Sequence, residues 1–229
     1  MSKIYLFAGA SSAIAKETAL LLKEKGHRVI GISTKSESYI YDEFYQVEKY
    51  DFDSFPEIIE PLDGLVYFPG TINLKPFARI SKTELLNDFQ INSLGAFAFI
   101  QAYLNNIKKS KMGSIVFFSS VAASIGLPFH SSIAMAKGGI EGLTHALAAE
   151  FAPSIRVNCI APSLVNTPMA DRFINTSEKI EQMKKRNPLQ QIGNPIDVAN
   201  AIEFLLSENS VWVSGQVIAV DGGMSKIKI

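Results

Sequence analysis

Short apolar runs alternate with helical patterns along almost the whole chain, and this alternation restricts the fold more than any other feature. Apolar runs of strand length lie at residues 3–8, 29–32, 45–47, 65–68, 115–118, 155–160 and 216–220. Near-continuous apolar strands are typical of parallel sheets buried on both faces, with helices as right-handed crossovers. The sequence therefore predicts an α/β fold: a Rossmann-type doubly wound, mostly parallel seven-stranded sheet with helices on both faces.

Helical periodicity separates these runs. The first helix carries Ala15, Ala19 and Leu22 on one face and ends before Gly26. Further helices are expected over residues 83–107, 133–151 and 195–206. Residues 169–190 form a looser, more polar segment.

The composition fits a single domain over residues 1–229. Apolar residues make up 47% of the chain and charged residues 19%, as in well-buried globular proteins. Lys+Arg and Asp+Glu are both 22, so no overall field favours nucleic acid or an anionic membrane. The longest apolar runs are too short to span a bilayer, and the single cysteine, Cys159, suits a reduced cytoplasmic setting. We expect no nucleic-acid partner, no membrane association and no metal site.

A turn of small residues joins the first strand to the first helix. Gly9, Ala13 and Ala15 keep side chains out of the way, so backbone N–H groups and the helix N-terminus can approach a pyrophosphate. A tight turn that only needs small residues fits the same pattern. The turn alone leaves both interpretations open.

Several motifs, in the correct order, resemble those of the short-chain dehydrogenase/reductase family. Gly9 matches the first glycine of the family's Gly-x-x-x-Gly-x-Gly turn, while Ala13 and Ala15 replace the other two. The other matching segments are the strand that ends at Gly70, residues 89–92 with Asn92, the strand that ends in Ser120, residues 155–162 with 167–169, residues 193–195 and residues 215–223. The resemblance covers nearly the whole chain.

This resemblance implies hydride transfer between NAD(P)(H) and a carbonyl or alcohol carbon of a small-molecule substrate. It implies catalytic roles for Ser120, Lys137 and Asn92. The cofactor contacts that it implies are Gly9, Ser11, Ser12, Ala13, Ile14, Ser33, Thr34, Lys35, Asp51, Phe52, Gly70, Lys137, Pro162, Val165 and Thr167.

The end of the second strand favours NADP(H) over NAD(H). An acidic residue at this point accepts hydrogen bonds from the ribose 2′-OH of NAD. Here Ser33, Thr34 and Lys35 follow the strand, and no carboxylate occurs before Glu37. Two hydroxyls and a lysine suit a 2′-phosphate better. A lysine that is merely solvated in a loop is the alternative.

The family's proton-donating tyrosine is absent. Ordinary members carry Tyr-x-x-x-Lys, with the tyrosine thirteen residues after the serine. Counting forward from Ser120 and back from Lys137 leads to the same residue, Ile133. This side chain can neither donate nor accept a proton.

His130 stands seven residues before Lys137, which is the spacing of Tyr-x6-Lys in the enoyl reductases of this superfamily. Residues seven apart lie on one helical face, and imidazole is the usual acid or base near neutrality. The alternative is a polar residue at the helix start, beside Ser131 and Ser132.

Three functions remain open. The first is a carbonyl or alcohol oxidoreductase in which Ser120, His130 or a lysine-bound water replaces the tyrosine. The second is an enoyl-type reductase with His130 at the tyrosine position of Tyr-x6-Lys. The third is a non-catalytic dinucleotide-binding protein, although the retained Ser120, Asn92 and Lys137 argue against it.

The resemblance also implies a substrate lid and an oligomer. The lid is expected at residues 169–190, where the polar composition predicts a segment that is mobile without cofactor and orders on binding. Association is expected through the helices at 83–107 and 133–151, giving a homodimer or homotetramer.

Overall fold

The computed structural model describes residues 2–36 and 39–228, so Glu37 lies outside the described residues. Its strands form one sheet in the order β3-β2-β1-β4-β5-β6-β7, and every neighbouring pair is parallel. The strands are β1 (Ile4–Ala8), β2 (Arg28–Ser33), β3 (Glu43–Gln46), β4 (Gly64–Tyr67), β5 (Gly113–Phe118), β6 (Ile155–Pro162) and β7 (Val217–Val220). The predicted seven-stranded Rossmann-type sheet is confirmed.

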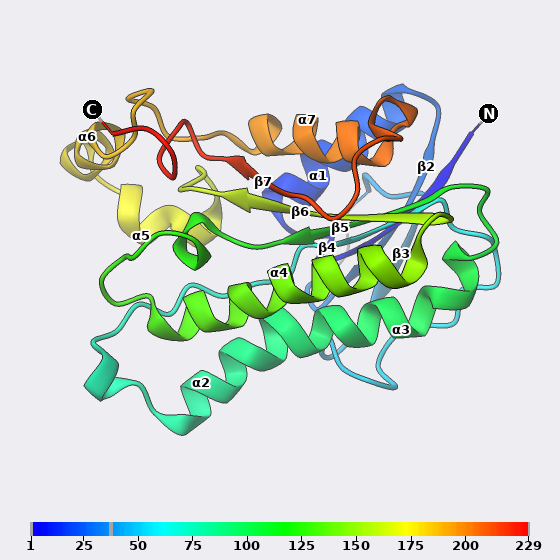
Figure 1. The fold of residues 1–229 in the computed structure, drawn as a ribbon, viewed down its shortest axis with the longest axis horizontal. Coiled ribbons are helices and arrows are strands. Elements are labelled where there is room, and N and C mark those ends of the chain that lie inside the picture. The colour runs from blue at the N-terminus through cyan, green and yellow to red at the C-terminus, as the bar shows by residue number, and fades with distance from the viewer. Residues whose placement is uncertain (1, 37–38, 229) are drawn as a thin grey trace.

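Helices cover both faces of this sheet (Figure 1). They are α1 (Ala13–Glu24), α2 (Lys82–Phe89), α3 (Gly95–Ile107), α4 (Ser131–Phe151), α5 (Asp171–Ile174), α6 (Ser177–Lys185) and α7 (Pro195–Leu206). Helices α3 and α4 pack on one face, and α1 and α7 pack on the other.

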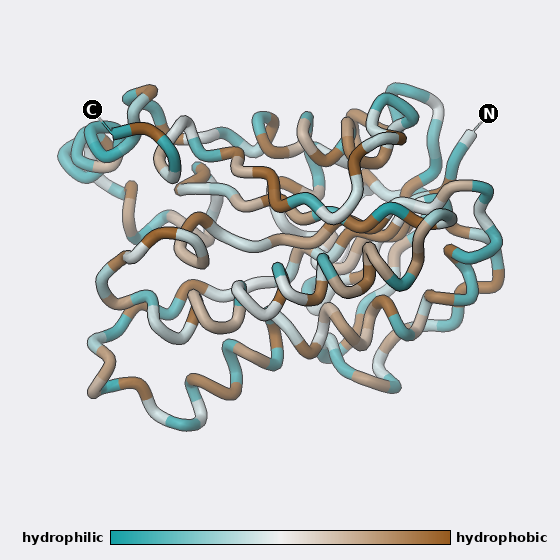
Figure 2. The backbone as a smooth tube through the Cα atoms, viewed as in Figure 1, coloured by the Kyte–Doolittle hydropathy of each residue, from teal (hydrophilic) through white to brown (hydrophobic). Residues whose placement is uncertain are grey.

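Successive side chains of each strand enter two separate apolar clusters, as the alternation of a pleated strand requires. In β1, Leu6 and Ala8 pack with α3 and α4, whereas Tyr5 and Phe7 pack with α1 and α7. Figure 2 shows hydrophobic residues along the central strands and hydrophilic residues in the outer loops. Burial on both faces explains why the strands appear in the sequence as near-continuous apolar runs.

The strand order reverses between β1 and β4. The chain leaves β1 for β2 and β3 on one side and returns to β4 on the other. In open α/β sheets, ligands bind in the crevice outside the carboxyl ends of the strands at such a reversal. The fold therefore places a site beside β1 and β4.

Residues 83–107, predicted as one helix, are divided by a π-helical turn at Gln90–Leu94. The hydroxyl of Tyr67 donates a hydrogen bond to the carbonyl oxygen of Ile91 at 2.7 Å. A Cβ at Gly95 would overlap this hydroxyl. The irregular turn, of a kind often found at functional sites, depends on a contact from β4 that helical periodicity cannot reveal.

Two other segments are more helical than predicted. Helix α4 begins at Ser131 and not at residue 133. The segment 169–190, predicted as irregular, contains α5 and α6. The side chain of Thr176 caps α6 by accepting the N–H of Lys179, and such a cap favours a helix even in a polar stretch.

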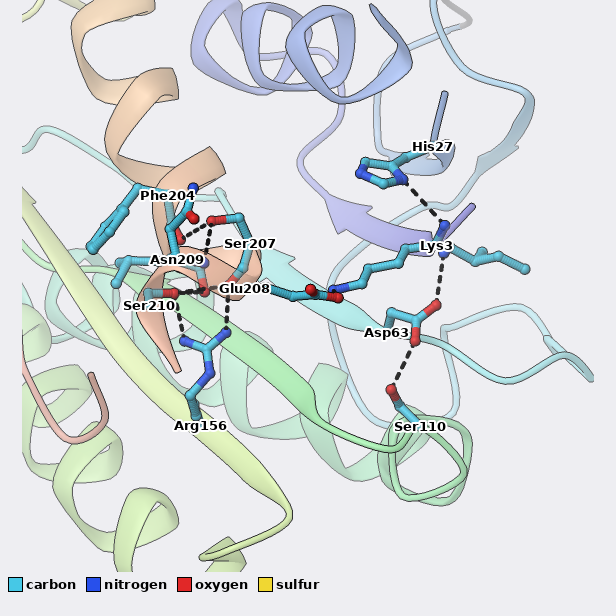
Figure 3. A network of polar contacts seen from close by, with 12 residues as sticks. Lys3, His27, Asp63, Ser110, Arg156, Phe204, Ser207, Glu208, Asn209 and Ser210 are labelled. Atoms are coloured by element: carbon cyan, nitrogen blue, oxygen red, sulfur yellow. Dashed lines mark hydrogen bonds and ion pairs between the residues drawn. The ribbon is translucent and has the colours of Figure 1, made fainter. Parts of the chain in front are cut away.

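A polar network fixes the amino ends of the strands, away from the cavity described below (Figure 3). The buried guanidinium of Arg156, near the start of β6, donates to the hydroxyl of Ser210 at 2.9 Å and to the carbonyl of Ser207 at 3.3 Å. Asp63, just before β4, accepts the N–H of Ile4 at 2.9 Å. These contacts hold α7 and the strand starts together, so the network is structural.

Candidate active site

A cavity of about 930 Å³ opens at the carboxyl ends of the strands. Segments that follow β1, β2, β4, β5 and β6 line it, as expected for this fold. The predicted site residues in its wall are Gly9, Ser11, Ser12, Ala13, Ile14, Thr34, Lys35, Gly70, Ser120, His130, Lys137, Pro162, Val165 and Thr167. Four predicted residues, Ser33, Asp51, Phe52 and Asn92, are not among the lining residues.

The turn after β1 has the shape that a pyrophosphate needs. Gly9 has a φ of 76°, which glycine adopts without strain, and a Cβ there would lie 2.8 Å from Cδ of Pro69. Ser12 caps α1, with its hydroxyl accepting a backbone N–H of the first turn. The N–H groups of Ala13 and Ile14 begin α1, where they have no acceptor within the helix and carry its positive end. The turn therefore fits a phosphate-bearing cofactor.

At the end of β2, Ser33 is fully buried behind the cavity wall. Its hydroxyl donates to Oγ of Ser11 at 2.9 Å and accepts the N–H of Lys35 at 3.1 Å. Ser33 therefore does not line the cavity in this structure, and its contact with a cofactor stays a prediction. Its hydroxyl instead positions Ser11 and Lys35, which both line the cavity.

Asp51 and Phe52 also lie outside the cavity wall. Asp51 forms an ion pair with Lys49 at 2.9 Å. Lys49 and Tyr50 line the cavity instead, and the hydroxyl of Tyr50 accepts the N–H of Thr34 at 3.2 Å. The contacts of Asp51 and Phe52 with the cofactor stay a prediction, and the structure adds Lys49 and Tyr50 as neighbours that line the cavity.

Lys137 lies in α4 where the chain passes β5, and only 7% of its surface is exposed. Its Nζ donates to the carbonyl oxygen of Phe118 at 2.8 Å. A Cβ at Gly70 would lie 3.3 Å from this Nζ and 3.2 Å from Oδ1 of Asn92, so three segments meet at this point. Burial lowers the pKa of Lys137 to about 8, which makes the ammonium a desolvated donor in the cavity wall.

Asn92 lies within the π-helical turn and is 1% exposed. Its Nδ2 donates to the carbonyl oxygen of Asp88 at 2.7 Å and to Oγ1 of Thr71 at 2.8 Å. Its Oδ1 accepts the N–H of Thr71 at 3.3 Å. The side chain therefore holds the loop after β4 in place from inside the wall.

Two serines end β5, and they differ in what their hydroxyls can do. Ser119 is buried and donates to Oε1 of Glu141 at 2.6 Å. Oγ of Ser120 accepts the N–H of Ala122 at 3.2 Å, and within the described chain no acceptor takes its proton. Ser120 is therefore able to donate a hydrogen bond to a ligand.

Ile133 lines the cavity at the position of the missing phenol. Among the described residues, Tyr50 is the only tyrosine in the cavity wall, and its hydroxyl accepts the N–H of Thr34, at the end of β2. No tyrosine described in the structure therefore replaces the absent side chain.

His130 precedes α4 and lines the cavity. Its Nδ1 lies 2.7 Å from the carbonyl oxygen of Pro128, so a neutral ring that donates from Nδ1 leaves Nε2 for a ligand. The preceding residue, Phe129, has a φ of 69°, an unusual conformation for an aromatic residue. Its carbonyl accepts the N–H of Lys75 at 3.2 Å. Backbone strain of this kind collects at functional sites.

Apolar side chains dominate the part of the wall made by the segment 169–190 and the loop before α4. They are Leu127, Phe129, Met169, Ala170, Phe173 and Met183. Helices α5 and α6 lie beyond the carboxyl ends of the strands (Figure 1). The guanidinium of Arg172 donates to the carbonyl oxygen of Ile72, which joins this segment to the loop after β4.

Sequence reasoning missed two polar residues of the wall. Thr71 lines the cavity, and Asp88 lies behind it with 1% of its surface exposed. A signal did exist for Asp88, since it stands four residues before Asn92 and thus on the same side of a helix.

The described ranges, 2–36 and 39–228, contain neither a metal-binding cluster nor a membrane-spanning helix. No group of three or more His, Cys, Asp or Glu side chains there has the arrangement of a metal site. No helix in those ranges has both the length and the apolar character needed to cross a bilayer.

A doubly wound sheet with a lysine, a serine and a glycine turn around one cavity at its carboxyl edge defines a Rossmann-type α/β protein. The family model described as enoyl-(acyl carrier protein) reductase matches residues 46–225. The 3-oxoacyl-[acyl-carrier-protein] reductase FabG of Thermotoga maritima is 32% identical over 241 residues, covering 97% of each chain. The chain belongs to the short-chain dehydrogenase/reductase family, which is a family of oxidoreductases.

Solved structures agree with this assignment. The aldohexose dehydrogenase of Thermoplasma acidophilum superposes with a TM-score of 0.89 at 25% identity, over 100% of this chain and 97% of its own. The protein ElxO, solved with NADP bound, gives a TM-score of 0.87 at 26% identity, over 98% of this chain and 99% of its own.

Proposed function

We propose that this protein is an NADP(H)-dependent oxidoreductase that transfers hydride to or from a carbonyl or alcohol carbon, with a proton donor other than residue 133. The observation that carries the proposal is the meeting of Lys137, Ser120 and His130 in one cavity with the glycine turn after β1. A bound nicotinamide supplies the hydride. Oxidation of NADPH in the presence of a panel of ketones and enoyl thioesters tests it.

The hydrogen-bonding capacity of Lys137 and Ser120 decides which part of the cofactor or substrate each side chain contacts. The ammonium of Lys137 has donors beyond the one that Phe118 accepts, and these suit ribose hydroxyls. Its positive charge also stabilises an oxyanion that forms on the substrate. Ser120 donates to the substrate oxygen, because its own oxygen is already oriented by the N–H of Ala122.

The proton is assigned to His130. With Nδ1 held by the carbonyl of Pro128, Nε2 of the protonated ring is the donor that reaches the substrate. Ile133 contributes apolar wall at this point and excludes water from it.

A second candidate, an enoyl-type reductase, is favoured by two observations. The matching family model carries that description, and His130 stands seven residues before Lys137. In this case hydride reaches an activated C=C bond. Turnover of enoyl thioesters without turnover of ketones separates this candidate from the first.

The cofactor preference is expected to depend on Lys35. Lys35 and Thr34 are exposed in the cavity wall at the end of β2, and a lysine there suits a 2′-phosphate. NADPH should bind at least several-fold more tightly than NADH, and Lys35→Asp should reverse the order because like charges repel. Fluorescence titration of both cofactors measures this. Equal affinity of the unmutated protein for the two cofactors is the contrary result.

Restoring the phenol provides a gain-of-function prediction. Ile133→Tyr places a hydroxyl four residues before Lys137, at a position that already lines the cavity. We expect ketone reduction to increase by about tenfold or more, with Ile133→Phe as the control that adds the ring without the hydroxyl. Equal rates for the two variants would show that the added hydroxyl does no proton transfer.

We further propose a single cofactor-binding domain whose lid is residues 169–190. Six residues of that segment line the cavity, namely Met169, Ala170, Phe173, Met183, Arg186 and Asn187. We also propose a homodimer or homotetramer. Exposed apolar side chains on the turn before α3, on α3 and on α4, namely Leu94, Phe97 and Met135, support it.

A further inference from the structure

Asp88 is a buried carboxylate surrounded by neutral donors. Its Oδ1 accepts the hydroxyl of Thr71 at 2.6 Å, and its Oδ2 accepts the hydroxyl of Ser132 and, at 3.3 Å, the Nδ2 of Asn73. None of the ion pairs found in the described ranges includes Asp88. A carboxylate is an acceptor only, and three converging donors satisfy that form. Through Ser132 it also lies at the first turn of α4, where the helix dipole favours a negative charge.

These contacts fix the hydroxyl of Thr71. A hydroxyl has one proton and two lone pairs. Thr71 gives its proton to Asp88, and one lone pair accepts Nδ2–H of Asn92 at 2.8 Å. One lone pair therefore remains, and Thr71 is one of the residues that line the cavity, directly after Gly70 in the chain.

The cavity wall thus carries two hydroxyls of opposite character. Ser120 has a proton to donate, because its oxygen accepts the N–H of Ala122. Thr71 has only a lone pair to offer. A bound molecule is matched to this wall when it presents an acceptor toward Ser120 and a donor toward Thr71.

We propose that Asp88 makes Thr71 an obligate hydrogen-bond acceptor, and that Thr71 thereby selects a hydroxyl or amide hydrogen on the small molecule bound in the cavity. Asp88 is a positioning residue, and Thr71 is the residue that determines specificity. The inference rests on the proposed function, which it deepens. The selected hydrogen belongs either to a substrate hydroxyl near the reacting carbonyl or to a ribose hydroxyl or carboxamide of the cofactor.

A site that hydrogen-bonds a ligand group strongly rejects an analogue that lacks this group. An apolar pocket rejects an analogue with an added hydroxyl much more weakly. Thr71→Val keeps the shape of the side chain and removes the acceptor, whereas Thr71→Ser keeps the acceptor. Ser132→Ala is the matched control, because it removes a different donor from Asp88 and leaves the contacts of Thr71 intact. Thermal unfolding of each variant shows that it is folded.

Two measurements distinguish the two sources of the hydrogen. The first is the Kd of NADPH from fluorescence titration. The second is the ratio of kcat/KM for ketone pairs in which a methyl group replaces a hydroxyl next to the carbonyl, such as hydroxyacetone and 2-butanone. If the substrate supplies the hydrogen, Thr71→Val lowers this ratio about tenfold or more with NADPH affinity unchanged. If the cofactor supplies it, NADPH affinity falls about tenfold and the ratio stays constant.

In either case, Thr71→Ser and Ser132→Ala should behave like the unmutated protein. Asp88→Asn should weaken the preference for a ligand that donates to Thr71. The amide of Asn can donate to the Thr71 oxygen, and the hydroxyl proton of Thr71 is then free to point toward the cavity. Unchanged NADPH affinity together with an unchanged ratio in Thr71→Val overturns the proposal. Calorimetric binding of the same ketone pairs with NADP⁺ present gives the preference without turnover, so failure of hydride transfer is distinguishable from failure of this inference.

Discussion

Replacing His130 with glutamine should lower kcat by about 100-fold or more on any substrate that the protein turns over. The imidazole lines the cavity and is oriented by the carbonyl oxygen of Pro128, 2.7 Å from its Nδ1. Glutamine keeps a polar side chain of similar reach but does not exchange a proton. Affinity for NADPH should stay the same, because the turn after β1, which we propose to hold the cofactor, is a different segment of the wall. Steady-state kinetics and cofactor titration together check both expectations.

His145→Gln is the matched control for this experiment. His145 lies on the same helix, α4, but is exposed and does not line the cavity. It should keep the kcat of the unmutated protein. If His130→Gln also keeps it on a confirmed substrate, histidine is excluded as the proton donor, and Ser120 or a lysine-bound water takes its place.

The sheet and its order of elements could be predicted because each strand is buried on both faces. This burial produces apolar runs such as residues 115–118, which are visible without any knowledge of contacts. The π-helical turn at Gln90–Leu94 could not be predicted in this way. It depends on a hydrogen bond from Tyr67, more than twenty residues earlier in the chain, whereas the sequence of residues 83–107 itself follows ordinary helical periodicity.

The same distinction, between what local sequence shows and what only the folded chain brings together, applies to the site residues. Gly9 and Ser120 line one cavity because they follow strands β1 and β5, and parallel strands end at one edge of the sheet; Lys137 lines the same cavity from helix α4. For Ser33 the sequence could not give the direction of the side chain, since a residue at a strand end can point either into the wall or into the cavity, and here it is bonded to Ser11 behind the wall. Asp88 was missed because its role arises only when Thr71 and Ser132, from distant segments, meet it in the fold.

The absent tyrosine changes what the buried lysine can do. In a protein with a phenol at position 133, an ammonium at Lys137 has an acid to activate. Here its Nζ donates to the carbonyl oxygen of Phe118. Gly70 packs against both this Nζ and the side chain of Asn92. We therefore expect Lys137 to act as a cofactor ligand and a fixed positive charge. A buried charge of this kind lowers the stability of the cofactor-free protein but strengthens cofactor binding.

Lys137→Met should stabilise the cofactor-free protein at pH 7 while weakening its binding of NADPH. Burial lowers the pKa of Lys137 from 10.5 to about 8, which corresponds to a cost on the order of 3 kcal/mol for the charged form in the folded state. Loss of the hydrogen bond to Phe118 offsets part of this. We therefore expect the free energy of unfolding to rise by about 1–2 kcal/mol at pH 7, measured by urea denaturation.

The pH dependence of the free energy of unfolding tests independently whether the charge of Lys137 destabilises the folded protein. Between pH 8 and 10.5 the unfolded chain binds a proton at Lys137 that the folded protein does not, so stability rises with pH across this window. The advantage of Lys137→Met should therefore be full below pH 8 and disappear as the pH approaches 10.5. Over the same experiments, the Kd of NADPH should increase about 10- to 100-fold at pH 7, as expected for loss of a charged donor. If Lys137 had a purely structural role, Lys137→Met would lower the free energy of unfolding at pH 7. That result would contradict the proposal that Lys137 binds the cofactor at a cost in stability.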